Sequence, residues 1–196
     1  MNPLTALPDP DSATMQRLHA RLVEAAAADD TLDLVYRTVD TPLGSLLLAA
    51  TPTGLVRVAY ESQDHDAVLA TLADRLSPRV LRAPGRLDAV AREIDDYFAG
   101  RRHTFDLPLD LQLARGFRRE VLTHLRDIAY GSTASYAVVA AAAGHPKAVR
   151  AVGTACAVNP LPIVIPCHRV VRSDGSIGAY VGGVPAKQTL LDLEAA

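Results

Sequence analysis

One stretch of the chain reads Asn159-Pro160-Leu161-Pro162-Ile163-Val164-Ile165-Pro166-Cys167-His168-Arg169-Val170-Val171. The β-branched run from Ile163 to Ile165 predicts a short, buried, extended segment. Pro166 ends this segment because proline has no N–H to offer a strand ladder. Cys167 is therefore expected where a strand ends and the chain turns, a position from which a side chain can point into a pocket.

Cys167 is followed directly by an imidazole and a guanidinium, those of His168 and Arg169. Nearby positive charge lowers the pKa of a thiol, and the thiolate is the reactive species. Two interpretations compete here. Cys167 is either a nucleophile or a small buried hydrophobic residue, which is what most free cysteines are. The motifs on either side of it favour the nucleophile.

Further motifs surround Cys167 in a fixed order. The pair Asn159-Pro160 precedes it, and two runs follow, Gly178-Ala179-Tyr180-Val181-Gly182-Gly183 and Lys187-Gln188-Thr189-Leu190-Leu191-Asp192-Leu193-Glu194. With Pro-Cys-His-Arg-Val between them, these motifs resemble the O6-alkylguanine-DNA alkyltransferase family. The resemblance is strong over residues 117–194 and reaches back more weakly to about Tyr36. Several motifs in the right order and spacing are a specific signal, unlike any one alone.

The resemblance implies two domains behind an N-terminal extension. Residues 1–33 are expected to form an arm and a helix, residues 34–109 an α/β domain that buttresses the catalytic one, and residues 110–196 the catalytic, DNA-binding helix-turn-helix domain. The α/β domain is expected to be ribonuclease-H-like, with a three-stranded antiparallel sheet and helices. The C-terminal domain is expected to be mostly helical and winged-helix-turn-helix-like.

Local patterns in the N-terminal half agree with an α/β domain. Alternating and apolar runs predict strands over 36–39, 45–50 and 55–60, and the tight turns between them suggest an antiparallel meander. Apolar residues at helical spacing predict helices over 64–76 and 87–98.

A further helix is predicted from Ser12, its expected N-cap, to about Ala28, where Asp29-Asp30 would end it. Met15, Leu18, Leu22 and Val23 share one face of that helix. Residues 1–11 look like a loose arm with three prolines. We interpret the whole extension as a packing extension or partly disordered arm rather than as a partner-binding helix.

Composition excludes several classes of protein. Hydrophobic content of 49% and mean hydropathy of +0.12 fit a soluble globular chain. No apolar run approaches the roughly 18–20 residues of a membrane span, and the first residues lack the features of a secretory signal. We therefore expect a cytoplasmic, nucleoid-associated protein with no membrane partner. Two cysteines, Cys156 and Cys167, cannot build a disulfide framework and match no zinc spacing, so no metal and no cofactor is expected.

Charge is distributed unevenly between the two halves. Residues 1–110 carry 17 acidic and 11 basic side chains, a net of −6, whereas residues 111–196 carry 9 basic and 5 acidic ones, a net of +4. The charge of a domain matters more for DNA binding than the net of −2 for the chain. The C-terminal excess permits a nucleic-acid partner without requiring one.

The region before the cysteine motif has the pattern of a helix-turn-helix. Ser135 can cap a helix over 136–143, Gly144-His145 breaks it, and Pro146 is expected at the first position of a second helix over 147–157. This second helix begins with small and basic residues that suit close contact with a DNA groove. Cys156, near its end, is interpreted as a packing residue.

The resemblance assigns DNA-contacting roles to residues of this helix pair. It implies that Arg150 intrudes into the base stack when the target nucleotide is rotated out, and that Tyr136 presses on the 3′ phosphate. The alternatives are a surface phosphate contact for Arg150 and a core position for Tyr136. The remaining expected DNA-contacting residues are Lys147, Ala148, Ala151, Gly153, Thr154 and Ala157.

The resemblance also assigns catalytic roles. Cys167 would attack the alkyl carbon, His168 would take the thiol proton, and Glu194 would orient the imidazole. Asn159 would fix the turn that bears Cys167, and the Tyr136 hydroxyl would donate to guanine N3. The base pocket is expected to consist of Tyr180, Val181 and Gly182. Val181 stands where some relatives have serine, which leaves only main-chain donors near O6.

These assignments imply DNA repair by irreversible transfer of an alkyl group from O6-alkylguanine in double-stranded DNA to Cys167, once per protein molecule. O4-alkylthymine is a further candidate substrate, and a monomer is expected. One alternative is a non-catalytic damage sensor or regulator that binds DNA through the helix-turn-helix, against which Cys167 argues. Another is a cysteine hydrolase using Cys167 and His168, but adjacent residues on an extended chain point apart.

Overall fold

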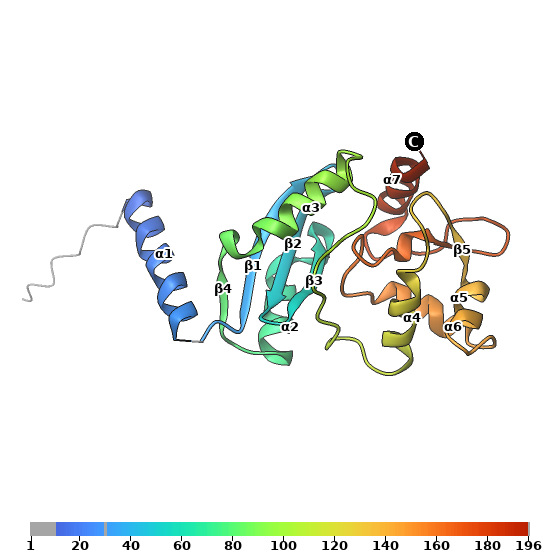
Figure 1. Ribbon diagram of the computed structural model, residues 1–196, viewed down its shortest axis with the longest axis horizontal. Helices are drawn as coiled ribbons and strands as arrows, with labels where there is room; N and C mark the ends of the chain where they lie inside the picture. Colours follow the sequence, from blue (N-terminus) through green and yellow to red (C-terminus); the bar gives the residue numbers. More distant parts are fainter. Residues whose placement is uncertain (1–10, 30, 196) are drawn as a thin grey trace, which may run out of the picture.

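The computed structural model of the protein describes residues 11–29 and 31–195 (Figure 1). Of the loose arm predicted over residues 1–11, residues 1–10 lie outside the described residues, as do Asp30 and Ala196. No helix within the described part is long and apolar enough to cross a membrane.

Helix α1, Ser12–Ala28, stands beside the rest of the molecule rather than inside it (Figure 1). Its N-cap is Asp11, whose carboxylate accepts a hydrogen bond of 2.6 Å from the Thr14 N–H. The prediction of Ser12 as N-cap was therefore wrong by one residue, because Asp11 offers an acceptor one position earlier. The predicted apolar face is not buried, since Met15, Leu18 and Leu22 are all about half exposed.

The N-terminal sheet has the strand order β3-β2-β1-β4. Strands β1 (Leu34–Thr41), β2 (Gly44–Thr51) and β3 (Gly54–Tyr60) form the predicted antiparallel meander. A fourth strand, β4 (Val80–Arg82), pairs in parallel with β1 and was not predicted. Three residues are too few to show an alternating pattern, so only tertiary pairing reveals this strand.

Helices cover the sheet on both faces. Helix α2 (His65–Arg75) packs on one face through Val68 and Leu72. Helix α3 (Asp88–Phe98) packs on the other face together with the C-terminal half of the chain. Both helices were predicted, and the 3-10 turns η1 (Glu61–Gln63) and η2 (Pro84–Leu87) precede them.

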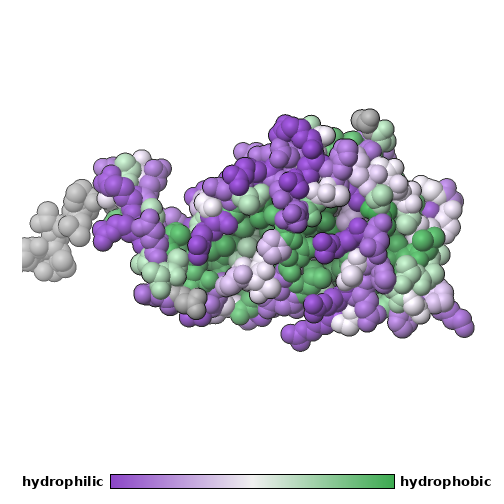
Figure 2. Space-filling model, in the orientation of Figure 1, coloured by the Kyte–Doolittle hydropathy of each residue, from purple (hydrophilic) through white to green (hydrophobic). Residues whose placement is uncertain are grey.

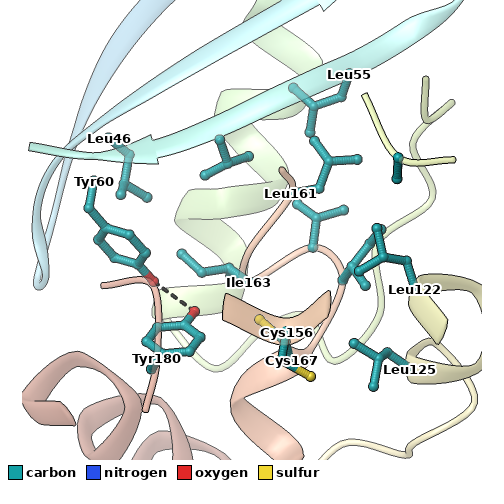
Figure 3. Packing of buried hydrophobic residues seen from close by; sticks show 14 of the residues in the cluster. Leu46, Leu55, Tyr60, Leu122, Leu125, Cys156, Leu161, Ile163, Cys167 and Tyr180 are labelled. Carbon is teal, nitrogen blue, oxygen red and sulfur yellow. Dashed lines mark hydrogen bonds between the residues drawn. The ribbon is translucent and has the colours of Figure 1, made fainter. Parts of the chain in front are cut away.

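The second face of the sheet shares its hydrophobic core with the C-terminal half. Leu46, Leu55 and Tyr60 point from the sheet toward Leu161 and Ile163 (Figure 3). Hydrophobic residues also show along the middle of the molecular surface, over the sheet (Figure 2). The segment that bears Cys167 is thus packed directly against the N-terminal sheet.

The connection between the halves is pinned to strand β3. The Leu55 N–H donates to Pro108 O at 2.8 Å, and the Asp110 N–H donates to Leu55 O at 2.8 Å. A Cβ at Gly54 would collide with the Pro108 backbone, so glycine is required for this close approach.

The C-terminal half is mostly helical, as predicted. It contains α4 (Phe117–Leu125), α5 (Tyr136–Ala142), α6 (Val149–Ala157) and α7 (Gly183–Ala195). The pair β5 (Ala134–Ser135) and β6 (Val170–Val171) forms a minimal parallel sheet between them. This arrangement places the end of the cysteine motif directly beside the start of α5.

Helix α6 begins two residues later than predicted. The Ala148 N–H donates to His145 O at 2.8 Å, which closes a turn around Pro146 and Lys147. Proline therefore serves the turn rather than the first helical position, and Ala148 is the N-cap. Ser135 does cap α5, because its hydroxyl accepts from the Val138 N–H at 3.2 Å.

The run from Ile163 to Ile165 is buried as predicted, but it is a turn rather than an extended segment. Ile163 has φ of +73°, a conformation that β-branched residues rarely adopt, and the Ile165 N–H donates to Leu161 O at 2.8 Å. Cys167 then begins the 3-10 turn η3, Cys167–Arg169. The hydrogen bonds of Asn159, described below, account for this departure from the local sequence preference.

Candidate active site

The turn that bears Cys167 is held by the fully buried side chain of Asn159. The Asn159 Oδ1 atom accepts from the Leu161 N–H at 2.9 Å, and its Nδ2 donates to Ile165 O at 2.9 Å. The same Nδ2 donates to Cys167 Sγ at 3.1 Å. One amide thus closes the turn and contacts the sulfur, which fixes the direction of the thiol.

The Cys167 thiol lies 2% exposed. Burial raises the pKa of this thiol to about 11, against the lowering effects of the Asn159 hydrogen bond and the Lys187 charge. The expectation of a lowered thiol pKa was therefore wrong for the resting protein, because loss of water outweighs the nearby cation. At neutral pH the group is a thiol that must lose its proton when it reacts.

Glu194, on helix α7, is a buried carboxylate that accepts five hydrogen bonds. His168 Nε2 donates at 2.9 Å, and Arg169 donates through Nε at 2.8 Å and Nη2 at 2.9 Å. The Tyr97 hydroxyl donates at 2.7 Å and the Gly131 N–H at 3.2 Å. Burial alone would raise the pKa of Glu194, but the hydrogen bonds from His168 and Arg169 lower it to about 2. Glu194 is therefore ionised.

Ionised Glu194 sets the tautomer of His168. A carboxylate can only accept, so His168 Nε2 carries the proton of that hydrogen bond. Burial lowers the pKa of His168, despite the opposing effect of Glu194, so the ring is neutral and Nδ1 holds the lone pair. This Nδ1 is buried and has no hydrogen-bond partner among the described residues. An unpartnered basic nitrogen on the residue that follows Cys167 is suited to accept a proton.

Arg169 does not serve the thiol, contrary to the initial interpretation. Its guanidinium binds Glu194, donates from Nη1 to Ile128 O at 2.5 Å, and lies 5.7 Å from the centre of the Tyr130 ring. Arg169 thus neutralises Glu194 and ties helix α7 to the turn that follows α4. The cation that acts on the thiol is Lys187 instead.

Lys187 is fully buried, and its ammonium group donates to Val170 O. It also lies 6.0 Å from the centre of the Tyr136 ring. Burial lowers the pKa of Lys187, while Cys167 and Cys156 act in the opposite direction. Lys187 opens the run that ends at Glu194, but nothing local in the sequence indicated that its charge acts on both cysteines.

Tyr136 is the first residue of α5 and is half-buried between two glycines. Its ring carbon Cε1 is 4.0 Å from where a Cβ on Gly153 would stand, and a Cβ on Gly178 would collide with its hydroxyl. Burial raises the pKa of Tyr136, so its hydroxyl stays protonated. The structure therefore places a phenolic donor between helix α6 and the segment that follows η3.

The expected base-pocket residues lie at the end of an irregular segment before α7. Tyr180 is buried, and its ring is 6.3 Å from that of His168 in an edge-to-face arrangement. Val181 and Gly182 are half-buried. The Tyr180 hydroxyl lies 2.9 Å from that of Tyr60, which comes from the N-terminal sheet (Figure 3).

The expected DNA-contacting residues share one side of helix α6 and its leading turn. Its opposite side, with Val152, Ala155 and Cys156, is buried in the core. The residues that remain exposed are Lys147, Arg150, Ala151, Thr154 and Ala157, while Ala148 and Gly153 are half-buried. Apart from Lys147 and Arg150 these side chains are small, so a DNA backbone could approach the helix closely.

Two tyrosines were missed by sequence reasoning. Tyr97 and Tyr60 reach the site from the N-terminal half, and neither stands in a motif that points to chemistry. No cluster of three or more histidine, cysteine or acidic side chains that could hold a metal occurs within residues 11–29 and 31–195.

The fold and site together define a class of protein, one in which a helix-turn-helix surface is joined to a buried cysteine with a His–Glu pair. Comparison with known proteins specifies the class further. Residues 34–111 match the ribonuclease-like domain of 6-O-methylguanine DNA methyltransferase, and residues 116–196 match its DNA binding domain. The chain belongs to this family.

The chain spans nearly the whole length of two similar proteins. The methylated-DNA–protein-cysteine methyltransferase of Mycolicibacterium paratuberculosis is 38% identical over 159 residues, 81% of this chain and 91% of the relative. The constitutive enzyme of that name from Bacillus subtilis is 37% identical over 163 residues, 81% of this chain and 94% of the relative.

Solved structures show the same fold. The O6-methylguanine methyltransferase of Mycobacterium tuberculosis superposes with a TM-score of 0.73 at 35% identity, covering 83% of this chain and 93% of that one. A structure of the Mycobacterium tuberculosis protein in complex with DNA gives a TM-score of 0.70 at 35% identity, covering 82% and 92%.

Proposed function

We propose that the protein repairs DNA by transferring the alkyl group of O6-alkylguanine to Cys167, irreversibly and once per molecule. The observation that carries this proposal is the Cys167 thiol, held by Asn159 and followed in the chain by His168, which is hydrogen-bonded to Glu194, in a chain of the methyltransferase family. DNA is the partner that the C-terminal domain binds.

The transfer is written as a single displacement. The Cys167 sulfur forms a bond to the alkyl carbon while the bond from that carbon to guanine O6 breaks, and the bonding pair stays with the guanine. The thiol proton passes through a water to His168 Nδ1, and the Tyr136 hydroxyl gives a proton to guanine N3. The product is a thioether, which hydrolysis does not reverse, so the protein is consumed.

The resting pKa of the thiol explains the need for a base. A thiol with a pKa of about 11 is almost wholly protonated at neutral pH. His168 is neutral and has a free lone pair on Nδ1, so it can accept the proton as the sulfur attacks. Glu194 then stabilises the imidazolium that forms, as an ionised carboxylate already hydrogen-bonded to it.

DNA engagement is assigned to the exposed side of helix α6. O6 of a paired guanine lies inside the duplex, so the nucleotide must rotate out, at a cost of a few kcal/mol. Arg150 is exposed on this side and is proposed to fill the vacated stack. Tyr136, at the N-terminus of α5, is proposed to contact the 3′ phosphate. Lys147, Ala148, Ala151, Gly153, Thr154 and Ala157 complete the proposed contact surface.

The base pocket is proposed to form against Tyr180, Val181 and Gly182. The valine side chain at 181 offers no hydrogen bond, so main-chain N–H groups of this segment would face guanine O6. O4-alkylthymine presents a similar alkyl ether and is a further proposed substrate. We also propose that the protein acts as a monomer, in the cytoplasm, with the functional domains divided at residues 33 and 109.

A non-catalytic damage sensor is the weaker alternative. A sensor would need the helix-turn-helix surface alone, whereas this chain keeps a cysteine held by Asn159 and, as the next residue, a histidine hydrogen-bonded to the Glu194 carboxylate. Nothing in the DNA-binding surface requires these three groups. Their arrangement therefore favours transfer over sensing.

Paired rate measurements on Arg150→Ala test the proposed coupling of DNA binding to transfer. Transfer from a duplex with one O6-methylguanine should slow roughly ten- to hundredfold, because nothing then fills the gap in the stack. Reaction with free O6-benzylguanine needs no rotation and should be nearly unchanged. Arg92→Ala, which removes an exposed arginine from α3, is the matched control and should react normally with both substrates.

The possible outcomes are distinct. Equal losses on duplex and free base would mean that Arg150 supports the pocket instead of the stack. A loss on duplex that disappears at saturating DNA would mean that it only holds phosphate. Transfer by the parent protein should stop at one alkyl group per molecule, and repeated turnover would overturn the proposed function itself.

A further inference from the structure

The segment between η3 and α7 is held by two tyrosines that each meet a glycine. Residues 176–180 form no helix or strand. At one end a Cβ on Gly178 would collide with the hydroxyl of Tyr136, and at the other a Cβ on Gly182 would lie 2.7 Å from Cε2 and Cζ of Tyr60. The two glycines are therefore close-contact positions, and the segment between them carries the proposed base-pocket residues.

Tyr60 comes from the N-terminal sheet, not from the catalytic domain. It is the last residue of β3 and is 3% exposed. Its hydroxyl lies 2.9 Å from the Tyr180 hydroxyl, and the two rings meet edge to face with centroids 5.9 Å apart. These contacts are drawn in Figure 3, where Tyr60 reaches across from the sheet to Tyr180.

The position of Tyr60 is fixed from its own side. Its backbone N–H donates to Gln63 Oε1 at 3.1 Å, within the 3-10 turn that follows β3 directly. The ring also belongs to the core that the two halves share. Because Tyr60 is held in this way, its ring can fix where the segment around Tyr180 and Gly182 lies relative to the sheet.

Tyr180 connects this contact to the reacting groups. Its ring packs edge to face on His168, 6.3 Å between centroids. Burial raises the pKa of both Tyr60 and Tyr180, and the nearness of Cys167 adds to this, so both hydroxyls remain protonated beside the sulfur. The pair therefore stays hydrogen-bonded throughout the pH range in which transfer would occur.

We infer that Tyr60 is a positioning residue for the alkyl transfer and that it limits the size of the alkyl group, by holding the outer wall of the base pocket through Tyr180 and Gly182. This inference rests on the proposed function. The segment that contains Tyr180 and Gly182 cannot move away from Tyr136, because the Tyr60 ring lies against Gly182. The N-terminal domain thereby contributes one side chain to substrate selection.

The test compares O6-benzylguanine with O6-methylguanine, each placed in the same duplex sequence. The quantity measured is the ratio of their second-order transfer rate constants, because this ratio does not depend on how much of a variant is folded. Tyr60→Leu removes the ring, so the wall can retreat and the benzyl-to-methyl ratio should rise by at least about fivefold. Tyr60→Phe keeps the ring but leaves the Tyr180 hydroxyl unpaired, and methyl transfer should slow by about three- to tenfold.

Tyr36 supplies the matched control. It is a tyrosine of the same sheet whose ring packs in the core on the opposite face. Tyr36→Leu should therefore leave the benzyl-to-methyl ratio unchanged, even where it lowers stability. If the benzyl-to-methyl ratio is the same in the parent protein, Tyr60→Leu and Tyr36→Leu, the inference about Tyr60 is wrong. Normal methyl transfer in the same experiment would still support the proposed function.

A second readout needs no transfer at all. The Cys167 thiol is buried in the resting protein, so its rate of alkylation by iodoacetamide reports how often the segment around Tyr180 and Gly182 opens to expose it. Peptide mapping should show faster labelling of Cys167 in Tyr60→Leu than in Tyr36→Leu, by at least about fivefold at equal helix content. Equal labelling would contradict the wall, whether or not the parent protein transfers alkyl groups.

Discussion

Glu194→Gln is expected to destabilise the protein strongly, because the carboxylate neutralises a buried cluster. Glu194 is 5% exposed and accepts hydrogen bonds from His168, Arg169, Tyr97 and Gly131. A glutamine amide has one acceptor oxygen, and its NH2 group would face the Arg169 donors. Removal of one member of a buried ion pair typically costs about 3–5 kcal/mol.

The pKa of Glu194 gives an independent magnitude. Its fall from an ordinary value of 4.5 to about 2 corresponds to about 3 kcal/mol of stability for the ionised form. Because the folded pKa is depressed, this contribution is fully present above about pH 5 and is lost as the pH falls toward about 2. A protonated carboxyl and an amide are both neutral, so the parent protein and the variant should converge in acid.

The assay is urea unfolding of both proteins at several pH values. We expect the unfolding free energies to differ by about 3 kcal/mol at pH 7 and by less than about 1 kcal/mol near pH 2. Glu120→Gln is the control, because Glu120 has an exposed side chain and should change stability by no more than about 0.5 kcal/mol. A difference that stays constant with pH, or one below about 1 kcal/mol at pH 7, would refute the claim that Glu194 is an ionised buried hub.

Three further predictions concern the reacting groups. Labelling of Cys167 by iodoacetamide should keep rising from pH 7 to 10, because burial raises the thiol pKa to about 11, and a plateau near neutrality would contradict this. Gly178→Ala should slow transfer from both duplex and free base by about tenfold or more, because the added methyl would collide with the Tyr136 hydroxyl, and a parent-like rate would show that the segment adapts. Asn159→Ala should lower the unfolding free energy by about 1–3 kcal/mol for each of the two buried backbone groups it leaves unpaired, and a melting temperature equal to that of the parent would argue against its role in the turn.

Local sequence patterns predicted the regular elements well and the cysteine turn poorly. The three antiparallel strands were recognisable because each alternates or is continuously apolar and ends at a tight turn. The Ile163–Ile165 run has strand-forming residues, yet Asn159 bonds to Ile165 O and Leu161 N–H and folds it into a turn. Side-chain hydrogen bonds from outside the run override its β propensity, and no local pattern shows that.

The motif residues of the candidate site could be predicted from the resemblance, but the tyrosines that hold them in place could not. Asn159, Cys167, His168 and Glu194 all stand in motifs that the sequence displays, and the structure joins them as two hydrogen-bonded pairs, Asn159 with Cys167 and His168 with Glu194. Tyr97 and Tyr60 approach from a different domain and lie far from these motifs in the chain. Only the packing of the sheet against the cysteine turn brings them in, so no spacing rule could have found them.

Mapping of the modified peptide shows which sulfur receives the alkyl group from DNA. The protein is incubated with a duplex that holds one O6-methylguanine, digested and analysed by mass spectrometry, with Cys156→Ala and Cys167→Ala in parallel. We expect one methyl group on Cys167 and none on Cys156, with Cys156→Ala reacting like the parent and Cys167→Ala not at all. Methyl on Cys156, or loss of methyl from the duplex in Cys167→Ala, would contradict it.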